Sequence, residues 1–408
     1  MSLHYYKEFG WDVEVICVDE KFVEGFRDNY LLETVPENVL VHRVEAWPLS
    51  ATSRFGLGSL SIRSYYYFKK KGTALLKRKK FDLVFFSTTM FHVCALGRYW
   101  KEKFGVPFVI DLQDPWRNDF YLSKPKAERP PKFWLAHFIH KHLEAMTMPY
   151  ADGIMAVSRG YIEEVKKRYP VIKNIPSVVI PFGCAVKDFE LVKERNLQPE
   201  IIGLNDHKIN VVYLGAVTKY FLPLIQAFFE SFKKNIRETA KYHFYFIGTS
   251  YTTGKPNRMV EKLAEDLDMQ GLVTEVSERI SYFSAIATMQ QADILFIPGS
   301  MDVDYNASKI YNNILAKKPI FSVFNNRSLV KEIVEKSNAG IVVGVDGQET
   351  LEEIVALIDQ KMGLFETLHT HVSTVELEMI ESFTARNKTK EQVAFFNSVI
   401  LNKQKISL

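Results

Sequence analysis

Two loops in the C-terminal half of the chain carry residues that suit a diphosphate. One follows an apolar run that ends at Gly215, where the missing side chain lets a phosphate approach the backbone, and Lys219 comes four residues later. The other leads into a helix that starts near Ser308, with Lys309 in its first turn. Free N–H groups at a helix start and a mobile cation both favour an anion. A simple strand–loop–helix unit capped by Ser308 is the alternative.

A third loop, in the N-terminal half, carries two carboxylates. Asp111 and Asp114 are three positions apart at the end of an apolar run, beside Trp116 and Arg117. Carboxylates with aromatic neighbours can orient sugar hydroxyls or stabilise an oxocarbenium-like centre. An N-cap by Asp114 or its ion pair with Arg117 is the alternative. His92 is a further catalytic candidate, although a lone histidine is more often structural.

Apolar, β-branched runs alternate with helical patterns along most of the chain and must position these loops. Continuous apolar strands between turn residues indicate parallel sheets covered on both faces, and their alternation with helices indicates doubly wound α/β domains. The predicted strands are 12–18, 39–43, 82–86, 107–111, 153–157 and 177–180, followed by 209–214, 243–247, 293–297, 319–323 and 340–344.

A chain of 408 residues exceeds the usual size of one hydrophobic core, so two domains are expected. The polar, poorly periodic stretch 181–208 predicts the interdomain linker. We therefore expect an N-terminal domain over 1–182 and a C-terminal domain over 183–385, with a terminal helix over 386–408 packing back on the first. Residues 4–10 resemble the end of a helix capped by Gly10, so the strand that normally opens such a domain is expected to be missing.

The composition bears on whether the protein binds metal, nucleic acid or a membrane. The three cysteines lack metal-ligand spacing and indicate reduced thiols in a cytoplasmic protein. The formal charge of +4 does not indicate nucleic acid. The aromatic and basic run at 65–80 suits an anionic membrane surface, which suggests a peripheral location at the inner face of the plasma membrane. The alternative is a solvated amphipathic helix whose aromatic side chains pack inward.

Several motifs, in order, resemble the retaining GT-B glycosyltransferases of family 4, and together they cover nearly the whole chain. SKIYNNILAKKPI is similar to that family's Ser-Lys-aromatic-Glu-aromatic-hydrophobic-Ala-x-x-Lys-Pro signature. The family's strand–Gly–x–x–x–Lys/Arg loop, its second strand ending in glycine and its Arg-hydrophobic block have counterparts here. The motifs that carry the resemblance are 109–121, 179–189, 209–221, 243–248, 279–298 and 308–320.

The resemblance implies two Rossmann-like domains facing each other across a cleft and a nucleotide-sugar donor bound by the second domain. The donor residues it implies include the glycine at Gly248, backbone groups at Ile280, and two positions that are glutamates in the family. The latter are Asp304, near the transferred sugar, and Asn312, at the nucleotide ribose. The first domain would use Asp114, with Asp111 and His92, for catalysis.

The implied reaction transfers a sugar from a nucleotide diphosphate to a hydroxyl of a glycan or lipid-linked acceptor, with retention of configuration. It needs no cofactor and no metal in this family, and it is typical of bacterial cell-surface polysaccharide synthesis. Two alternatives stay open: a GT-B sugar-nucleotide epimerase, and a catalytically silent sugar-binding protein. The second is favoured by departures from the family pattern at Asn312, Ala185 and Lys317.

Overall fold

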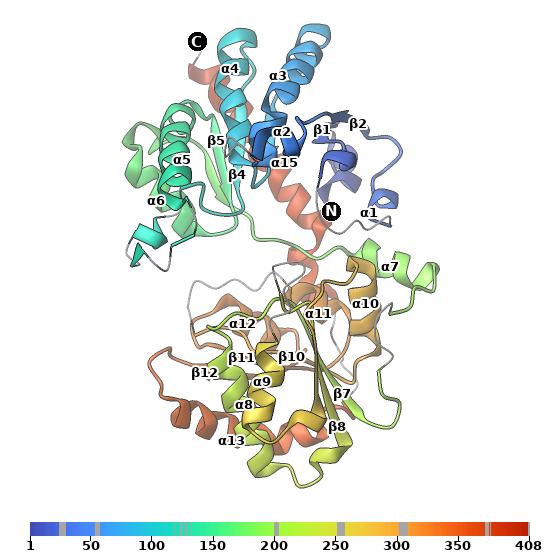
Figure 1. Ribbon diagram of the computed structural model, residues 1–408. Helices are drawn as coiled ribbons and strands as arrows, with labels where there is room; N and C mark the ends of the chain where they lie inside the picture. Colours follow the sequence, from blue (N-terminus) through green and yellow to red (C-terminus); the bar gives the residue numbers. More distant parts are fainter. Residues whose placement is uncertain are drawn as a thin grey trace. The chain divides into compact units, whose positions relative to one another are not determined.

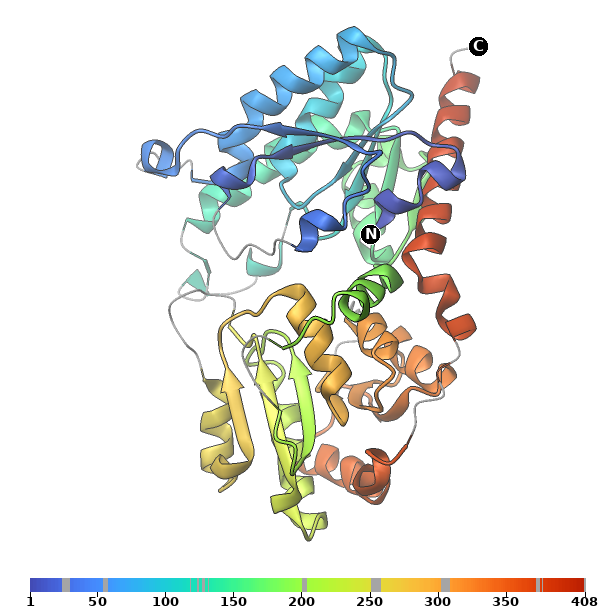
Figure 2. The ribbon, with the colours of Figure 1, turned by 90° about the vertical axis from the view of Figure 1, so that its right-hand side faces the viewer.

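The computed structural model divides into two compact units (Figures 1 and 2). The N-terminal unit comprises Ser2–Glu24, Val35–Phe182 and Arg386–Leu408, and the C-terminal unit comprises Met1, Gly25–Thr34 and Gly183–Ala385. The grouping of Gly25–Thr34 with the C-terminal unit is not expected from the sequence. The residues that the structure describes are 1–23, 30–53, 58–117, 119–122, 125–126, 129–130, 132–199, 204–250, 258–301, 309–371, 375 and 377–406.

Parallel strands form two sheets in the N-terminal unit. Strands β1 (Glu14–Val18) and β2 (Leu40–Val44) pair in a two-stranded sheet. The larger sheet has the order β3-β4-β5-β6. Its strands are Val84–Ser87, Phe108–Leu112, Gly153–Ala156 and Ser177–Val179. All of its pairings are parallel, as the apolar runs predict.

Helices cover both faces of the larger N-terminal sheet. Alternate residues of β4 point to opposite faces. Phe108 and Ile110 join the core beneath α3 and α4, while Val109 packs with Phe396 and Val399 of the terminal helix. The helices of this unit are α2 (Leu49–Thr52), α3 (Leu60–Arg78), α4 (Ala95–Phe104), α5 (Phe133–Thr147), α6 (Arg159–Arg168) and α15 (Ala385–Ile406).

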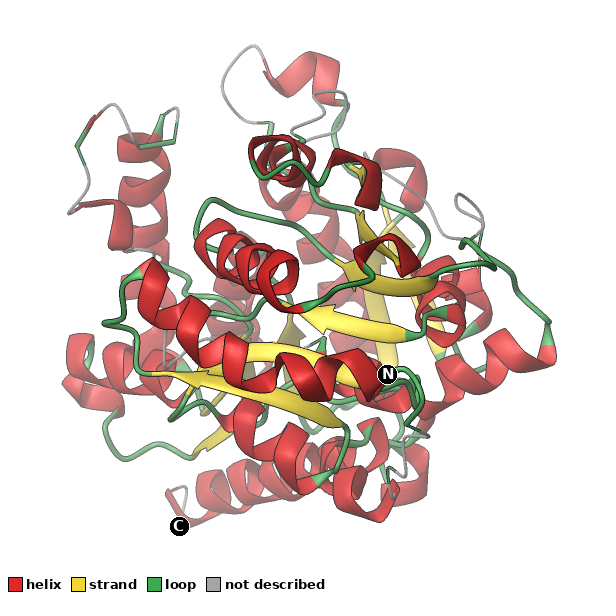
Figure 3. Cartoon of the chain, turned by 90° about the horizontal axis from the view of Figure 1, so that it is seen from below, coloured by secondary structure: helices red, strands yellow, loops and turns green. Residues whose placement is uncertain are grey.

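The C-terminal unit is a six-stranded parallel sheet between helices (Figure 3). Its order is β12-β11-β10-β7-β8-β9, so the chain runs outward from the centre in both directions. The strands are β7 (Ile209–Leu214), β8 (Tyr242–Ile247), β9 (Val273–Val276), β10 (Ile294–Ile297), β11 (Ile320–Asn325) and β12 (Gly340–Val345). The adjacent pair β7 and β10 is where the strand order reverses, which is the usual ligand site of such sheets.

One face of this sheet is covered by a core rich in phenylalanine from α8, and the other by a core that includes α10 and α11. The described helices of this unit are α1 (Tyr30–Glu33), α7 (Val186–Glu194), α8 (Leu222–Asn235), α9 (Met259–Asp266), α10 (Tyr282–Gln291), α11 (Ile310–Leu315), α12 (Leu329–Lys336), α13 (Leu351–Leu368) and α14 (Leu377–Ile380). The doubly wound fold predicted from the sequence is thereby confirmed.

Three local predictions need correction. The stretch 181–208 is not only a linker, because α7 lies within it and buries Phe189 and Val192 three residues apart. Strand β9 was not predicted, since its sequence VTEV has too few apolar residues to form a continuous run. Residues 4–10 form short 3₁₀ turns rather than the end of an α-helix, although Gly10 does cap the last turn with φ +81°.

Candidate active site

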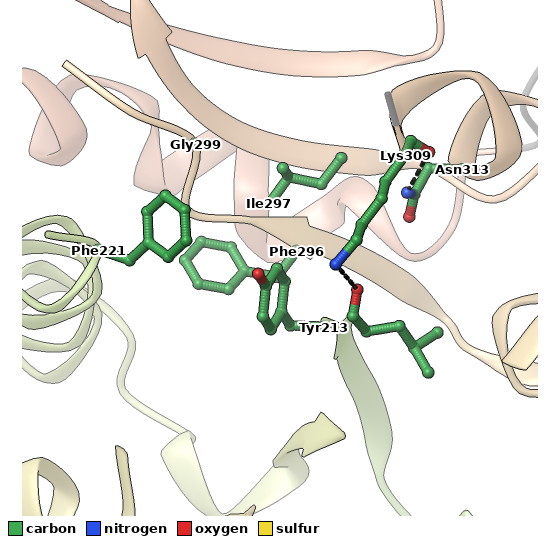
Figure 4. Close-up of a pocket in the computed structure, with 8 residues that line it drawn as sticks. Tyr213, Phe221, Phe296, Ile297, Gly299, Lys309 and Asn313 are labelled. Carbon is green, nitrogen blue, oxygen red and sulfur yellow. Dashed lines mark hydrogen bonds between the residues drawn. The ribbon is translucent and has the colours of Figure 1, made fainter. Parts of the chain in front are cut away.

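The carboxyl ends of β7 and β10 enclose a pocket in the C-terminal unit (Figure 4). Its unfilled space, including the opening, is about 350 Å³. Gly299 adopts φ +61°, and a Cβ there would lie 1.8 Å from the carbonyl oxygen of Val323, so only glycine fits beside β11. The lining residues are Tyr213, Leu214, Phe221, Phe296, Ile297, Gly299, Lys309 and Asn313.

Lys309 supplies the positive charge of this pocket. It stands immediately before α11 and extends across the pocket, so that Nζ lies 3.4 Å from the carbonyl oxygen of Leu214 (Figure 4). The ring centroid of Tyr213 is 6.0 Å from the same nitrogen. Desolvation of the ammonium group lowers the pKa of Lys309, and the positive charge of Arg279 lowers it further. An anionic ligand in this pocket would therefore stabilise the charged form of Lys309.

Gly215 allows Lys309 to take this position. It has φ +149°, and a Cβ added there would lie 1.9 Å from Nζ of Lys309. Its N–H donates to the carbonyl oxygen of Ile247 at 2.9 Å, which holds the turn against β8. The structure therefore brings Gly215 and Lys309 together, although 94 positions separate them in the chain.

The next loops place two more of the predicted donor residues. Gly248 ends β8 with φ +74°, and a Cβ there would lie 3.9 Å from Cα of Arg279. Ile280 follows Arg279 and is half-buried against the core. Lys219 is exposed, with Nζ 5.6 Å from the ring of its neighbour Tyr220. The sequence prediction named Ile280 but not Arg279. The structure shows that the charge of Arg279 acts on Lys309.

Asn312 does not project as a free ribose ligand. Its Nδ2 donates to Oη of Tyr282 at 3.3 Å, and that hydroxyl donates to Oδ2 of the buried Asp188 at 2.8 Å. Burial raises the pKa of Asp188, and the bond from Tyr282 offsets part of this effect. Asp304 and Ser308 lie outside the described residues.

In the N-terminal unit, Asp111 is held rigidly at the end of β4. Its Oδ2 accepts from Oγ of Ser87 at 3.1 Å and from Nε2 of Gln113 at 2.9 Å, and the side chain is only 6% exposed. Burial raises the pKa of Asp111, while these two bonds lower it. Gln113 thus orients Asp111.

Asp114 lies beyond this network. Its side chain is exposed, and partial desolvation of the carboxylate raises its pKa. Arg117 does not form the ion pair with Asp114 that was considered as an alternative. Instead its Nε donates to Oδ1 of Asp119 at 2.8 Å, and His137 contacts the same oxygen at 2.7 Å.

His92 is packed in a polar contact between helices. Its Nδ1 lies 2.7 Å from Oγ of Ser61 on α3, and its ring centroid lies 4.9 Å from that of His140 on α5. Burial lowers the pKa of His92 to about 4, with a smaller contribution from His140. His92 is therefore neutral at pH 7. His140 could not be recognised from the sequence, because the fold alone brings these positions together.

The basic and aromatic run at 65–80 lies mainly on α3. Phe68 is buried, Tyr65 and Tyr67 are half-buried, and Tyr66 is 52% exposed. Most of the aromatic surface therefore packs inward. Most basic side chains of the run are exposed, although Lys79 forms an ion pair with Glu14. Among the described residues, none of the helices is both long and apolar enough to cross a membrane. Nor do the described residues contain a group of three or more His, Cys, Asp or Glu side chains that could hold a metal ion.

Comparison with protein families matches residues 3–187 to Glycosyltransferase Family 4. None of the curated proteins matches the chain. Among solved structures, the chain is similar to HepE of Anabaena in complex with UDP-glucose, with a TM-score of 0.56 and 14% identity over 94% of this chain and 99% of that chain.

Two further structures have a similar architecture. A glycosyltransferase from Rickettsia africae gives a TM-score of 0.55 and 14% identity over 97% of this chain and 92% of that chain. The N-terminal domain of trehalose-6-phosphate phosphatase from Candida albicans gives a TM-score of 0.60 and 11% identity over 98% of this chain and 93% of that chain. At these identities the likeness shows the fold, which is GT-B.

Proposed function

We propose that this chain, whose residues 3–187 match Glycosyltransferase Family 4, transfers a sugar from a nucleotide diphosphate to a hydroxyl of a glycan or lipid-linked acceptor. One observation carries the donor assignment. The ammonium group of Lys309 lies beside Gly215, where the strand order of the sheet reverses, and it experiences the charge of Arg279. A diphosphate there would neutralise the charge of Lys309 at the usual ligand site of such sheets.

The donor's leaving group is proposed to interact with Lys309 and Lys219. Negative charge develops on the diphosphate as its bond to the sugar breaks, so fixed cations stabilise the transition state more than the ground state. The backbone at Gly215 and Gly248 leaves room for phosphate oxygens, and Ile280 would present backbone groups to the base. No metal is required in this scheme, because side-chain cations perform the charge neutralisation.

Retention of configuration is part of the proposal. The leaving diphosphate would accept the proton of the attacking hydroxyl on the same face of the sugar, so catalysis would consist mainly of positioning and charge stabilisation. Asn312 would reach a ribose hydroxyl only after leaving Tyr282, so its role in the ligand-free protein is to hold that tyrosine. Asp304 and Ser308 are proposed donor contacts on the motif alone.

The acceptor is proposed to bind the N-terminal unit. Asp114 is the exposed carboxylate of the loop after β4 and would orient an acceptor hydroxyl, while the anchored Asp111 fixes the loop. His92 is neutral at pH 7 and serves as a hydrogen-bond partner rather than a cation. Free cysteines and the basic surface of α3 support a cytoplasmic enzyme that meets a lipid-linked acceptor at the inner face of the plasma membrane, in polysaccharide synthesis.

A thermal-shift experiment tests the donor assignment. UDP, GDP, ADP and dTDP are added separately at millimolar concentration, and a ligand that binds only the folded protein raises its melting temperature. We expect a rise with at least one of them in the wild type and a smaller rise in Lys309→Ala. No rise with any nucleotide would remove the proposed donor site.

A further inference from the structure

Helix α5 presents an unusually apolar face to solvent. Trp134 is 73% exposed, and Phe138 and Met146 are each 57% exposed. These side chains occur at intervals of four and eight residues, so they lie along one side of the helix. The exposed residues of α5 are Trp134, Ala136, Phe138, Lys141, His142, Ala145 and Met146.

No carboxylate lies on this exposed face, and all 15 residues of α5 are described. The one acidic residue of the helix, Glu144, is fully buried. Its carboxylate accepts from Tyr169 at 3.0 Å and from Arg168 at 3.3 Å, so it neutralises charge inside the unit rather than outside it. A solvated helix normally places alternating charges on its outer face, and α5 places aromatic and aliphatic groups there.

Cations adjoin the C-terminal end of this face. Arg98 of α4 donates to the carbonyl oxygen of Met146 at 3.3 Å, and its guanidinium lies 3.8 Å from the ring centroid of Tyr150. Lys101 donates to the carbonyl oxygen of Tyr150 at 2.8 Å. Both cations also pair with carboxylates, Arg98 with Glu102 and Lys101 with Asp152, so the net charge at this end comes mainly from other basic residues of α3 and α4. The exposed ring of Tyr150 therefore sits between the apolar face and basic side chains of α4.

The positive charge continues from α4 onto α3. Lys69 of α3 lies 4.3 Å from the ring centroid of Tyr99, and Lys103 donates to the hydroxyl of the same tyrosine at 3.1 Å. Helix α3 contains no Asp or Glu, and five of its six Lys and Arg residues are at least partly exposed, since only Arg63 is buried. Helices α3, α4 and α5 pack in succession against the same core of the N-terminal unit (Figure 1).

We propose that the exposed face of α5, with the basic side chains of α3 and α4, docks on the surface of an anionic lipid bilayer. The helix would lie in the plane of the interface, with Trp134, Phe138 and Met146 among the acyl chains. Amphipathic helices bind this way when apolar burial and attraction to anionic lipids act together. The charge of α3 and α4 favours a bilayer over a second copy of the chain, which would bring like charges together.

This proposal differs from the sequence prediction for residues 65–80 in one respect. The apolar contact comes from α5, whereas α3 contributes charge, because Phe68 is buried and Tyr65 and Tyr67 are half-buried. It does not depend on the donor assignment, so each can fail while the other stands.

Vesicle sedimentation tests the proposal with the full chain. Vesicles contain either phosphatidylcholine alone or phosphatidylcholine with 30% phosphatidylglycerol, a composition chosen for its negative charge. We expect the wild type to bind the anionic vesicles preferentially and to bind less as salt rises. The double variant Trp134→Ser, Phe138→Ser should lower the partition constant by about tenfold or more, since it removes two large apolar side chains from the interface.

Leu401→Ser is the matched control, because Leu401 is 58% exposed in the same unit on α15, which packs against the opposite face of the sheet from α3 and α4. It should bind vesicles like the wild type. Changing Lys69, Lys70 and Lys71 to Glu should weaken binding and reduce its salt dependence. Each variant is first shown to keep the wild-type melting temperature, and a double variant that melts early is replaced by Trp134→Gln, Phe138→Gln.

Several results would overturn the proposal. They are failure of the wild type to bind anionic vesicles, equal binding by the wild type and the α5 double variant, and equal losses in that variant and Leu401→Ser. Ultracentrifugation without lipid addresses the alternative occupant. A dimer that the α5 double variant dissociates would show that a second copy covers this face instead.

Discussion

Replacing Lys309 by alanine tests the proposed diphosphate contact most locally. In the ligand-free protein its Nζ lies 3.4 Å from the carbonyl oxygen of Leu214, near the long limit for a hydrogen bond, so a phosphate oxygen would replace a weak contact. A hydrogen bond to a charged group contributes about 1.5–3 kcal/mol, and about 1.4 kcal/mol is tenfold in affinity. We therefore expect the dissociation constant of the matching nucleoside diphosphate to rise roughly 10- to 150-fold.

Although Lys309→Ala should bind nucleotide more weakly, its stability without nucleotide should not fall. The side chain of Lys309 is exposed and its hydrogen bond to Leu214 is long, while desolvation and the charge of Arg279 lower the pKa of its ammonium group, so the fold gains little from this side chain. Lys309→Ala should therefore melt at the wild-type temperature or slightly above it without nucleotide. A variant that binds weakly but melts normally separates loss of the ligand contact from loss of the fold.

Isothermal calorimetry with the nucleotide that gives the largest thermal shift measures the affinities. Lys262→Ala serves as the control, because Lys262 is an exposed lysine of the same unit on α9. It should bind as the wild type does. The reasoning is refuted if Lys309→Ala binds with wild-type affinity, or if Lys262→Ala loses as much as Lys309→Ala.

Four other substitutions test packing and burial in the two units. Gly215→Ala should lower both nucleotide affinity and melting temperature, because φ +149° is strained for alanine and the new Cβ would displace Nζ of Lys309; the strain is on the order of 1–3 kcal/mol. In α3, Gly72→Ala should lower the free energy of unfolding measured by urea titration by about 1–3 kcal/mol, since its Cβ would lie 2.3 Å from the buried ring of Trp100. Gly363→Ala in α13 meets no atom within 4 Å and should raise the same free energy by up to about 1 kcal/mol. For His92, burial lowers the folded-state pKa to about 4, below the unfolded value of about 6.5, so the unfolded chain binds the extra proton between these values. The free energy of unfolding should therefore fall as the pH drops from 6.5 to 4 and be insensitive to this group above 6.5, and urea titrations at pH 7 and 4.5 should show a smaller fall in His92→Gln.

The sequence predicted the sheets well because most strands are buried on both faces and form continuous apolar runs. Strand β9 escaped because Glu275 interrupts its apolar pattern. That carboxylate is buried in the structure, where it accepts from Thr249 and from backbone N–H groups at the start of α9. Local composition cannot show that a charged residue will be buried and hydrogen-bonded, because the donor groups come from other segments of the chain.

Part of the candidate site could likewise be predicted from the sequence, and part could not. Gly215 and Lys309 were predicted from motifs that follow strands, and the order of the sheet explains why they meet. The bond from Asn312 to Tyr282, the pairing of His92 with His140 and the apolar face of α5 all depend on tertiary contacts or exposure. Sequence spacing identifies candidate residues, but it does not show which of their side chains already form hydrogen bonds or ring contacts within the fold.

Release of nucleoside diphosphate from a donor tests the central claim most directly. The protein is incubated with a panel of UDP-, GDP-, ADP- and dTDP-sugars, with and without a membrane-derived glycolipid fraction, and the free nucleoside diphosphate is quantified. The account predicts release from at least one donor, increased by acceptor, and a larger loss of rate than of affinity in Lys309→Ala. Absence of release from every donor, or equal rates in the wild type and Lys309→Ala, would contradict it.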